Sequence, residues 1–442
     1  MNKVVLGTLV LGLLCVQPTK GQEVPLSLDQ ALEATFNNNK EIHLATLDEA
    51  AAEARYGQTN AVFLPQIKLT YTGMSTNNPL NAFGFKLQQQ AITQEDFNPA
   101  LLNEPSATQN FMTKAEWRQP ILNMDMWSIR QAAQEQQHVY AFKTKRTKEL
   151  VVFEVQKAYA QLQLAYQAKG VLEEAVQTVN AIYAATNNRF EKGYLQKSDV
   201  LQVQVQVKTT ENKLAEAISN IQNASDYLGL LMGARAGVIY QVDSISISSV
   251  TPIENTQATI SDDRADFKAM QSAISAHERM INSGKMSYLP HVNAFGEFMI
   301  NDPKAFGFGS NAYLVGAELS WTLFNGTATR NRVWEQRIER DKTVAHLALQ
   351  KEKAQLELNK TLRQLQDSQF AIQRQEIAVS QSTEVLRIVE NRYQQGLVTT
   401  NDVLQAQSLL AQQKLLLAEA AYQYHTTAAY QLFITSTSVK QK

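Results

Sequence analysis

Charged side chains alternate with apolar ones in the segment FMTKAEWRQPIL at positions 111–122. The charged residues Lys114, Glu116 and Arg118 occupy every second position. Because successive side chains of a strand point to opposite faces, a strand here would place all three on one face and leave the other face apolar. Such a strand suits a boundary between water and an apolar phase, and its charges would contact ions or solutes in that water.

Two acidic residues occur at equivalent positions of a repeated phrase. RFEKGYLQKSDVLQ at 189–202 recurs as RYQQGLVTTNDVLQ at 392–405, which aligns Asp199 with Asp402. Each acid lies in the first turn of a predicted helix, where the helix dipole stabilises a negative charge. The residues themselves therefore indicate an ordinary helix terminus for both acids.

The remaining residues do not indicate catalysis. The six histidines are scattered without metal-ligand spacing, and no glycine-rich phosphate-binding loop occurs. A formal net charge of −1 provides no positive field for nucleic acid. We expect no enzyme, no cofactor or metal site, and no nucleic-acid partner.

The N-terminus predicts export. An apolar run at 4–16 suits a secretory signal and is too short to span a membrane. Small residues ahead of Gln22 predict cleavage there, so residues 1–21 would be a signal peptide. Cys15 is the single cysteine. Its lipidation is the alternative, but the preceding Leu14 is not the small residue that a lipoprotein signal carries.

Secondary structure is predicted to follow one order twice. Ser27 and Gln30 form a capping box that opens a helix with apolar residues at helical spacing to about Val62. A strand pair comes next, and then Asn123 would cap a very long helix. In the second half Asn325 heads the corresponding long helix.

Period-two alternation predicts four strands. They lie at about 65–73 and 111–121 in the first half and at about 290–300 and 312–324 in the second. The segment of about 74–110 between the first two is interpreted as an expanded loop. Glu297 and Glu318 fall on the polar faces of the later strands.

Each long helix is predicted to turn at a glycine and return as a second helix. The two hairpin tips are placed at about 193–197 and 396–400. The resulting division is a signal peptide (1–21), a first repeat (22–233), a linker (234–262), a second repeat (263–436) and a C-terminal tail (437–442). Arg189 and Arg392, close to helix C-termini, are interpreted as partners of the helix dipole.

Four amphipathic strands demand association. The smallest membrane barrels use about eight strands, and an open sheet edge in lipid leaves backbone groups unsatisfied. A dimer would enclose room only for its own side chains. A trimer would supply twelve strands, whose polar faces could line water with Lys114, Glu116, Arg118, Glu297 and Glu318. The long helices, with alternating apolar and Gln/Ala/Glu-rich faces, suit coiled-coil partners that continue the pore as a tube.

The duplicated plan, the two Leu-Pro pairs before strands and the paired phrases at 189–202 and 392–405 together resemble the TolC-like outer membrane efflux proteins. The likeness covers essentially the whole mature chain. It implies a mainly α fold with a small β part, in which long coiled-coil helices form a periplasmic α-barrel and four strands per chain contribute to a trimeric 12-strand transmembrane β-barrel. It also implies a homotrimer in outer-membrane lipid, served by a periplasmic adaptor (membrane fusion protein) and an inner-membrane RND or ABC-type transporter.

The resemblance also assigns roles to tip residues. The turns that would contact the adaptor are Gly193-Tyr194-Leu195 and Gly396-Leu397-Val398. Asp402 matches an acidic residue of the periplasmic gate, and Gln405 stands where a second acidic ring would fall. Tyr393 matches an aromatic gate position, with Asp199 as its expected partner. Val398 replaces the basic residue of the family's gate latch.

The implied function is the outer-membrane channel-tunnel of a tripartite efflux or type I secretion system, in a Gram-negative outer membrane with a long periplasmic extension. Drugs, metal ions and secreted polypeptides all remain possible cargo. The alternative is a structural trimeric coiled-coil stalk or adhesin anchored in the outer membrane. Two tips pointing away from the strands favour the channel.

Overall fold

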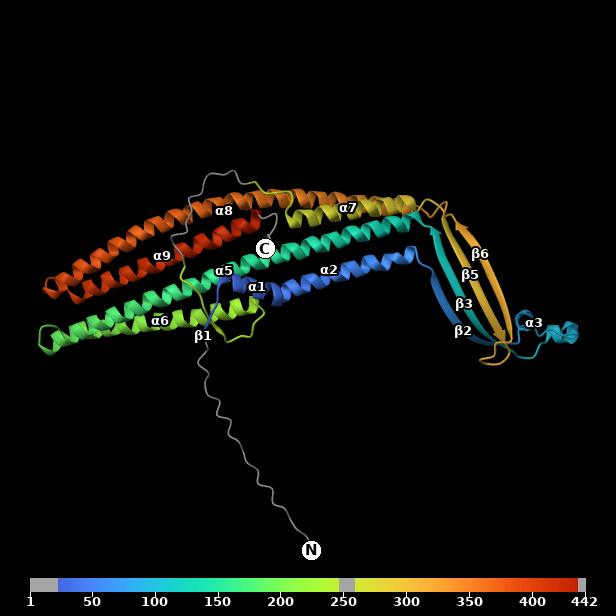
Figure 1. Ribbon diagram of the computed structural model, residues 1–442, viewed down its shortest axis with the longest axis horizontal. Helices are drawn as coiled ribbons and strands as arrows, with labels where there is room; N and C mark the ends of the chain where they lie inside the picture. The colour runs from blue at the N-terminus through green and yellow to red at the C-terminus, as the bar shows by residue number, and fades with distance from the viewer. Residues whose placement is uncertain (1–22, 246–258, 436–442) are drawn as a thin grey trace, which may run out of the picture. The chain divides into compact units, whose positions relative to one another are not determined.

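The computed structural model describes residues 23–245 and 259–435. Within these ranges the chain is mainly helical, with a four-stranded and a two-stranded sheet (Figure 1). The predicted signal peptide at 1–21, which includes Cys15, and the predicted tail at 437–442 lie outside the described residues. No helix in the described ranges has a segment long and apolar enough to cross a membrane.

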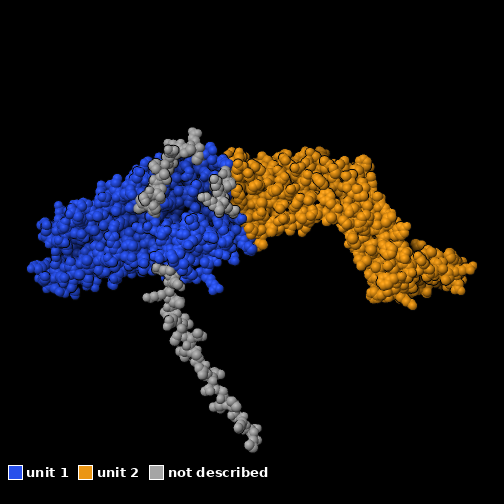
Figure 2. Space-filling model, in the orientation of Figure 1, with its two compact units in different colours: residues 1–43, 147–261, 354–442 blue, residues 44–146, 262–353 orange. Residues whose placement is uncertain are grey.

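The chain forms two compact units, each built from both halves of the sequence (Figure 2). Unit 1 comprises 1–43, 147–261 and 354–442, and unit 2 comprises 44–146 and 262–353. Each unit therefore contains segments of both predicted repeats.

Unit 1 contains two helical hairpins. The C-terminal part of α5 (Met124–Glu191) turns into α6 (Lys197–Leu231), and that of α8 (Ala328–Gln394) turns into α9 (Thr400–Thr435). A short parallel pair, β1 (Glu23–Pro25) with β4 (Ile239–Gln241), lies in the same unit.

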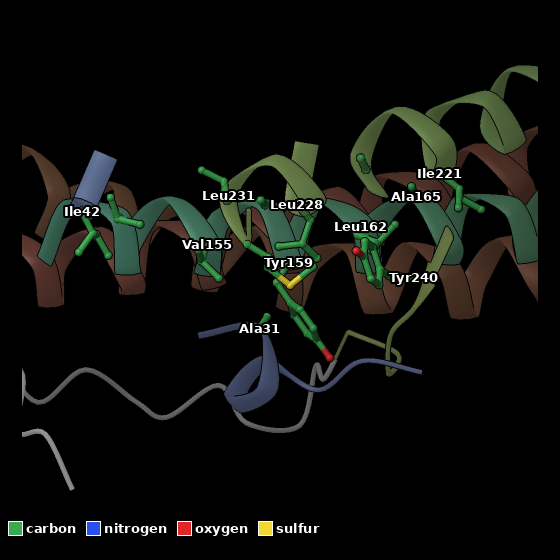
Figure 3. Packing of buried hydrophobic residues seen from close by; sticks show 14 residues of the cluster. Ala31, Ile42, Val155, Tyr159, Leu162, Ala165, Ile221, Leu228, Leu231 and Tyr240 are labelled. Atoms are coloured by element: carbon green, nitrogen blue, oxygen red, sulfur yellow. The ribbon is translucent and has the colours of Figure 1, made fainter. Parts of the chain in front are cut away.

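The largest core cluster of unit 1 forms where α1 (Leu28–Asn38), β4, α5 and α6 pack together (Figure 3). Leu162 and Leu228 are fully buried there. The Tyr159 hydroxyl donates to the Leu26 carbonyl oxygen at 3.0 Å, which ties the start of the chain to α5. The predicted capping box is confirmed, since Ser27 and Gln30 bond each other's backbone N–H groups.

The sequence predicted one continuous first helix, and this prediction is wrong. It is broken into α1 and α2 (Lys40–Gln58), followed by the 3-10 helix η1 (Thr59–Val62). Asn39 makes the break, with an extended ψ of 129°. Its amide donates to the Leu231 carbonyl oxygen at 2.8 Å, and its Oδ1 accepts from the Ile42 N–H at 3.0 Å. A buried asparagine that caps one helix and bonds to another can interrupt a helix while the apolar spacing in the sequence stays unchanged.

Unit 2 carries the four-stranded sheet in the order β2-β3-β5-β6, all antiparallel. The strands are β2 (Gln66–Thr76), β3 (Thr108–Leu122), β5 (His291–Asp302) and β6 (Ser310–Ser320). Helix α7 (Ala265–Met286) precedes β5. Strands β2 and β6 are the two edges, and neither has a second partner in the described chain.

The fourth strand and the second long helix are shorter than the sequence predicted. Strand β6 ends at Ser320, so Trp321 leaves the sheet and donates its indole N–H to the Tyr288 carbonyl oxygen at 2.9 Å. Gly326 and Thr327 both have positive φ, of 65° and 71°. That backbone cannot belong to a right-handed helix, so α8 begins only at Ala328.

The segment interpreted as an expanded loop at about 74–110 contains short helices. Strands β2 and β3 extend into it, and between them lie α3 (Pro79–Gln88), the 3-10 helix η2 (Gln94–Phe97) and α4 (Pro99–Asn103). Asn78 and Asn98 cap the two α-helices ahead of a first-turn proline. The two Asn-Pro pairs of this segment therefore act as helix-start signals.

Candidate functional site at the hairpin tips and the polar sheet face

The two hairpin tips share one backbone geometry. Gly193 and Gly396 have φ of 79° and 77°. After the first glycine, the Tyr194 N–H bonds the Arg189 carbonyl oxygen at 2.9 Å, and the matching Leu397 N–H bonds that of Arg392 at 3.0 Å. This is the Schellman ending, in which a left-handed residue lets the chain satisfy the last carbonyls of a helix.

The predicted gate acids cap their own helices. The Asp199 carboxylate accepts from the Gln196 N–H at 3.0 Å. The Asp402 carboxylate accepts from the Thr399 hydroxyl at 2.7 Å and the Thr399 N–H at 2.8 Å. These bonds, the hydroxyl first, lower the pKa of Asp402 below its usual range. A capping role is therefore present in the single chain.

Tyr393 is buried between the two hairpins, with 7% of its surface exposed. Its hydroxyl lies 3.3 Å from the Thr186 hydroxyl and 3.2 Å from that of Thr400. The ring belongs to a cluster drawn from all four hairpin helices: Val179, Ile182, Val203, Val207, Tyr393, Val403 and Leu404. Within the single chain the two residues have separate partners: two threonine hydroxyls hold the Tyr393 hydroxyl, and the Asp199 carboxylate bonds its own turn.

Arg189 crosses from the first hairpin to the second. Its Nη2 donates to the Tyr393 carbonyl oxygen at 3.0 Å, and its guanidinium carbon lies 4.2 Å above the centre of the Tyr393 ring. The carbonyls at a helix end carry partial negative charge, and an aromatic face attracts a cation, so both contacts favour arginine. The interpretation of Arg189 as a partner of its own helix dipole is therefore too narrow.

The predicted adaptor-contact residues divide by exposure. Tyr194 and Leu397 are 77% and 69% exposed. Leu195 and Val398 are half-buried, and Val398 packs against the Tyr393 cluster. Gln405 is exposed on α9. Each tip thus presents one large side chain, Tyr194 or Leu397, to solvent.

On the sheet, strand register places the five predicted lumen residues on one face. Glu116 lies directly opposite Glu297, and Glu318 lies opposite Asn293 on the same face. Lys114 Nζ bridges the two facing carboxylates, 2.7 Å from Glu116 Oε1 and 2.9 Å from Glu297 Oε1. The other face is apolar, with 73% of Leu69 and 69% of Val315 exposed. One face suits water and the other suits lipid.

Sequence reasoning missed the contacts between hairpins. Thr186, Thr400 and the interhairpin role of Arg189 were not identified, although Arg189 and Arg392 stood out as a repeated pair. One sequence feature could have indicated these contacts: the second phrase has Tyr393 where the first has Phe190. A tyrosine in an apolar site needs a partner for its hydroxyl.

Two helical hairpins with matched tips, and a sheet with one polar and one apolar face, thus define the architecture. The sequence profile described as "Outer membrane efflux protein" matches residues 31–234 and 259–431. The chain therefore belongs to the outer membrane efflux protein family.

Relatives and solved structures agree with this assignment. The cation efflux system protein CusC of Escherichia coli K12 is 23% identical over 393 residues, which cover 86% of this chain and 80% of CusC. The probable outer membrane lipoprotein SilC of Salmonella typhimurium is 20% identical, with the same coverage of 86% and 80%. A CusC crystal structure has a TM-score of 0.79 at 17% identity, covering 93% of this chain and 92% of that one. The Campylobacter jejuni CmeC outer membrane channel has a TM-score of 0.78 at 14% identity, covering 99% and 94%.

Proposed function

We propose that this protein is the outer-membrane channel-tunnel of a tripartite export system and works as a homotrimer. The observation that carries the proposal is the four-stranded sheet with an apolar face, a polar face and two unpaired edges, β2 and β6. In lipid those edges must be satisfied, and pairing β2 of one copy with β6 of the next closes a twelve-strand barrel with Lys114, Glu116, Arg118, Glu297 and Glu318 inside.

Light scattering of the detergent-solubilised protein, corrected for detergent, tests the trimer. We expect the mass of three protomers and a conducting pore in planar bilayers. A monomer or dimer that conducts would contradict the closure argument, and a trimer that does not conduct would favour a stalk or adhesin.

The helical hairpins are proposed to extend into the periplasm and to dock on an adaptor that is bound to an inner-membrane RND or ABC-type pump. Exposed Tyr194 and Leu397 support this, because each tip offers an apolar side chain on a rigid turn. Photo-crosslinkers at these two positions should capture the adaptor, whereas the same crosslinker at exposed Lys208 on α6 should not. Conduction is passive and involves no catalysis, so the pump selects the cargo.

The tips are also proposed to form the periplasmic gate. Three copies each of Asp402 and Gln405 would surround the aperture, with Asp199 and Tyr393 behind them. Converging carboxylates attract cations. Asp402→Ala should therefore weaken cation selectivity and block by multivalent cations in bilayer recordings, and Asp199→Ala should do less. Unchanged selectivity and block would reduce Asp402 to a helix cap.

Cations are the first cargo class to test, because the relative CusC is named for cation efflux. A strain that lacks this protein should become sensitive to toxic metal salts and recover with the gene. Sensitivity to drugs alone would assign the channel to a different pump.

A further inference from the structure

The connection between β2 and β3 folds as a small module, defined here as residues 77–107. Lys86 Nζ lies 2.5 Å from Asp96 Oδ1, which joins α3 to η2. The Lys86 ammonium and the Thr93 N–H and hydroxyl lower the pKa of Asp96 to about 2. Phe83 and Phe97 meet edge to face at 5.7 Å. The module has its own internal contacts and is not a loose loop.

A buried polar network attaches the module to the end of the sheet. Gln89 Nε2, just past the end of α3, donates to Asn110 Oδ1 at 3.0 Å, and Asn110 Nδ2 donates to Asn301 Oδ1 at 2.9 Å. The Ser310 hydroxyl donates to the Gln88 carbonyl oxygen at 2.6 Å. Asn110, Asn301 and Ser310 are 0%, 2% and 3% exposed. Buried amides with all these bonds made hold one geometry, because breaking any bond strands a polar group.

Strand alternation shows which face carries this network. Asn110 shares a face with Lys114, Asn301 with Glu297, and Ser310 with Glu318, by the period of two along each strand. The module is therefore attached to the polar face, at the end of the sheet where β2 and β5 end (Figure 1).

The equivalent connection of the second half takes the opposite side. Between β5 and β6, Phe306 stacks on Tyr71 with ring centroids 5.2 Å apart, and its N–H donates to the Tyr71 hydroxyl at 2.9 Å. Tyr71 is on the apolar face, in step with Leu69. Thus one connection covers the apolar face and the other covers the polar face at the same end of the sheet.

We propose that the module is a size filter at the outer mouth of the channel. The inference rests on the proposed function: in the closed trimeric barrel the polar face lines water, so three modules would be fixed at the lumen side of the mouth. They would admit small solutes and retard large ones. The filter is held in position by the side chains of Gln89, Asn110 and Asn301. It needs no moving part.

The test is entry of thiol reagents from outside intact cells. Thr70, on the polar face opposite Lys114, is replaced by cysteine in a chain whose predicted mature form has no other thiol. Polyethylene-glycol maleimides of increasing length are added to Thr70→Cys with the module intact, and to the same variant with residues 79–105 replaced by a short Gly/Ser linker. Short reagents should label both, and long reagents should label only the linker variant.

A milder variant guards against misfolding after the deletion. Gln89→Ala with Asn110→Ala keeps the module but removes the amide bonds of its attachment, leaving only the bond from Ser310 to the Gln88 carbonyl oxygen, and should shift the size limit to longer reagents. Leu80→Ser, at a residue 80% exposed on α3, is the matched control and should leave the limit unchanged. An identical size limit in the intact, unattached and deleted forms, all trimeric by light scattering, would overturn the filter alone. If even the shortest reagent fails to label Thr70→Cys in the linker variant, the polar face does not line water, and the proposed function falls together with the filter.

Discussion

The two hairpin tips have the same backbone but different surroundings. Gly193 and Gly396 have φ values within a few degrees of each other, and the acids at 199 and 402 cap the following helices. Yet Phe190 is 37% exposed, whereas its counterpart Tyr393 is 7% exposed and holds Arg189 above its ring. The two copies thus share the turn. The contacts between the hairpins differ, because Arg189 and Tyr393 meet whereas their counterparts Arg392 and Phe190 are exposed.

This asymmetry has a simple physical source. A turn depends on a few neighbouring residues, so each copy forms it independently. A contact between hairpins forms only once, because Arg189 and Arg392 cannot both take the same place at a single interface. The tips should therefore respond alike to backbone changes and unlike to side-chain changes.

The largest expected effect follows truncation of the buried ring. Tyr393→Ala should lower the free energy of local opening at the tips by about 3–5 kcal/mol, the usual cost of removing a buried aromatic side chain. Phe190→Ala should cost roughly 1 kcal/mol, because much of that ring is already in water. Amide hydrogen exchange of the flanking helix ends measures both. Similar losses in the two variants would contradict the one-sided interface.

Backbone strain should affect the tips equally. Gly193→Val and Gly396→Val each place a β-branched side chain at positive φ, at a cost of about 1–2 kcal/mol. No atom lies close enough to either glycine to add a clash. Exchange at the two turns, with crosslinking to the adaptor in parallel, should show matched losses while the trimer stays assembled. A clear difference between the variants would mean that the turns are not independent.

Removing the interhairpin cation should have a smaller, one-sided effect. Arg189→Gln gives up the contact with the Tyr393 ring and weakens the bond to its carbonyl, for about 1 kcal/mol. Arg392→Gln is the matched control at an exposed position and should change little. Exchange of the tip amides should separate the two. Equal behaviour of both variants would return Arg189 to a simple helix-dipole role.

The smallest effect concerns acid. Because the folded pKa of Asp402 is depressed, its capping contribution is complete above the unfolded pKa and is lost as pH falls through the lower folded value. Opening of the turn at Thr399 should therefore increase only in acid, below the ordinary aspartate range. In the Asp402→Ala variant the turn at Thr399 should already open more often at neutral pH, and this opening should no longer depend on pH. Persistence of the acid response in Asp402→Ala would assign it to another group.

The amino-acid sequence by itself determined the local features of this protein. A glycine after a helix and an acid in the next first turn define each tip within about ten residues. Alternation along 111–122 defines which side chains share a face, because the strand period is a property of the backbone. These features were predicted correctly since they need no distant partner.

Only the tertiary structure decided how segments from the two halves meet. Register set Glu116 opposite Glu297, where the Lys114 ammonium bridges the two like charges. Packing of the hairpins placed Arg189 over the Tyr393 ring and left Phe190 exposed. A buried hydrogen-bond network attached the 77–107 module to the polar face. No local pattern in the sequence shows which residues about half the chain apart will meet. Their pairing depends on three-dimensional packing, where a single buried asparagine or tyrosine hydroxyl must find a hydrogen-bond partner.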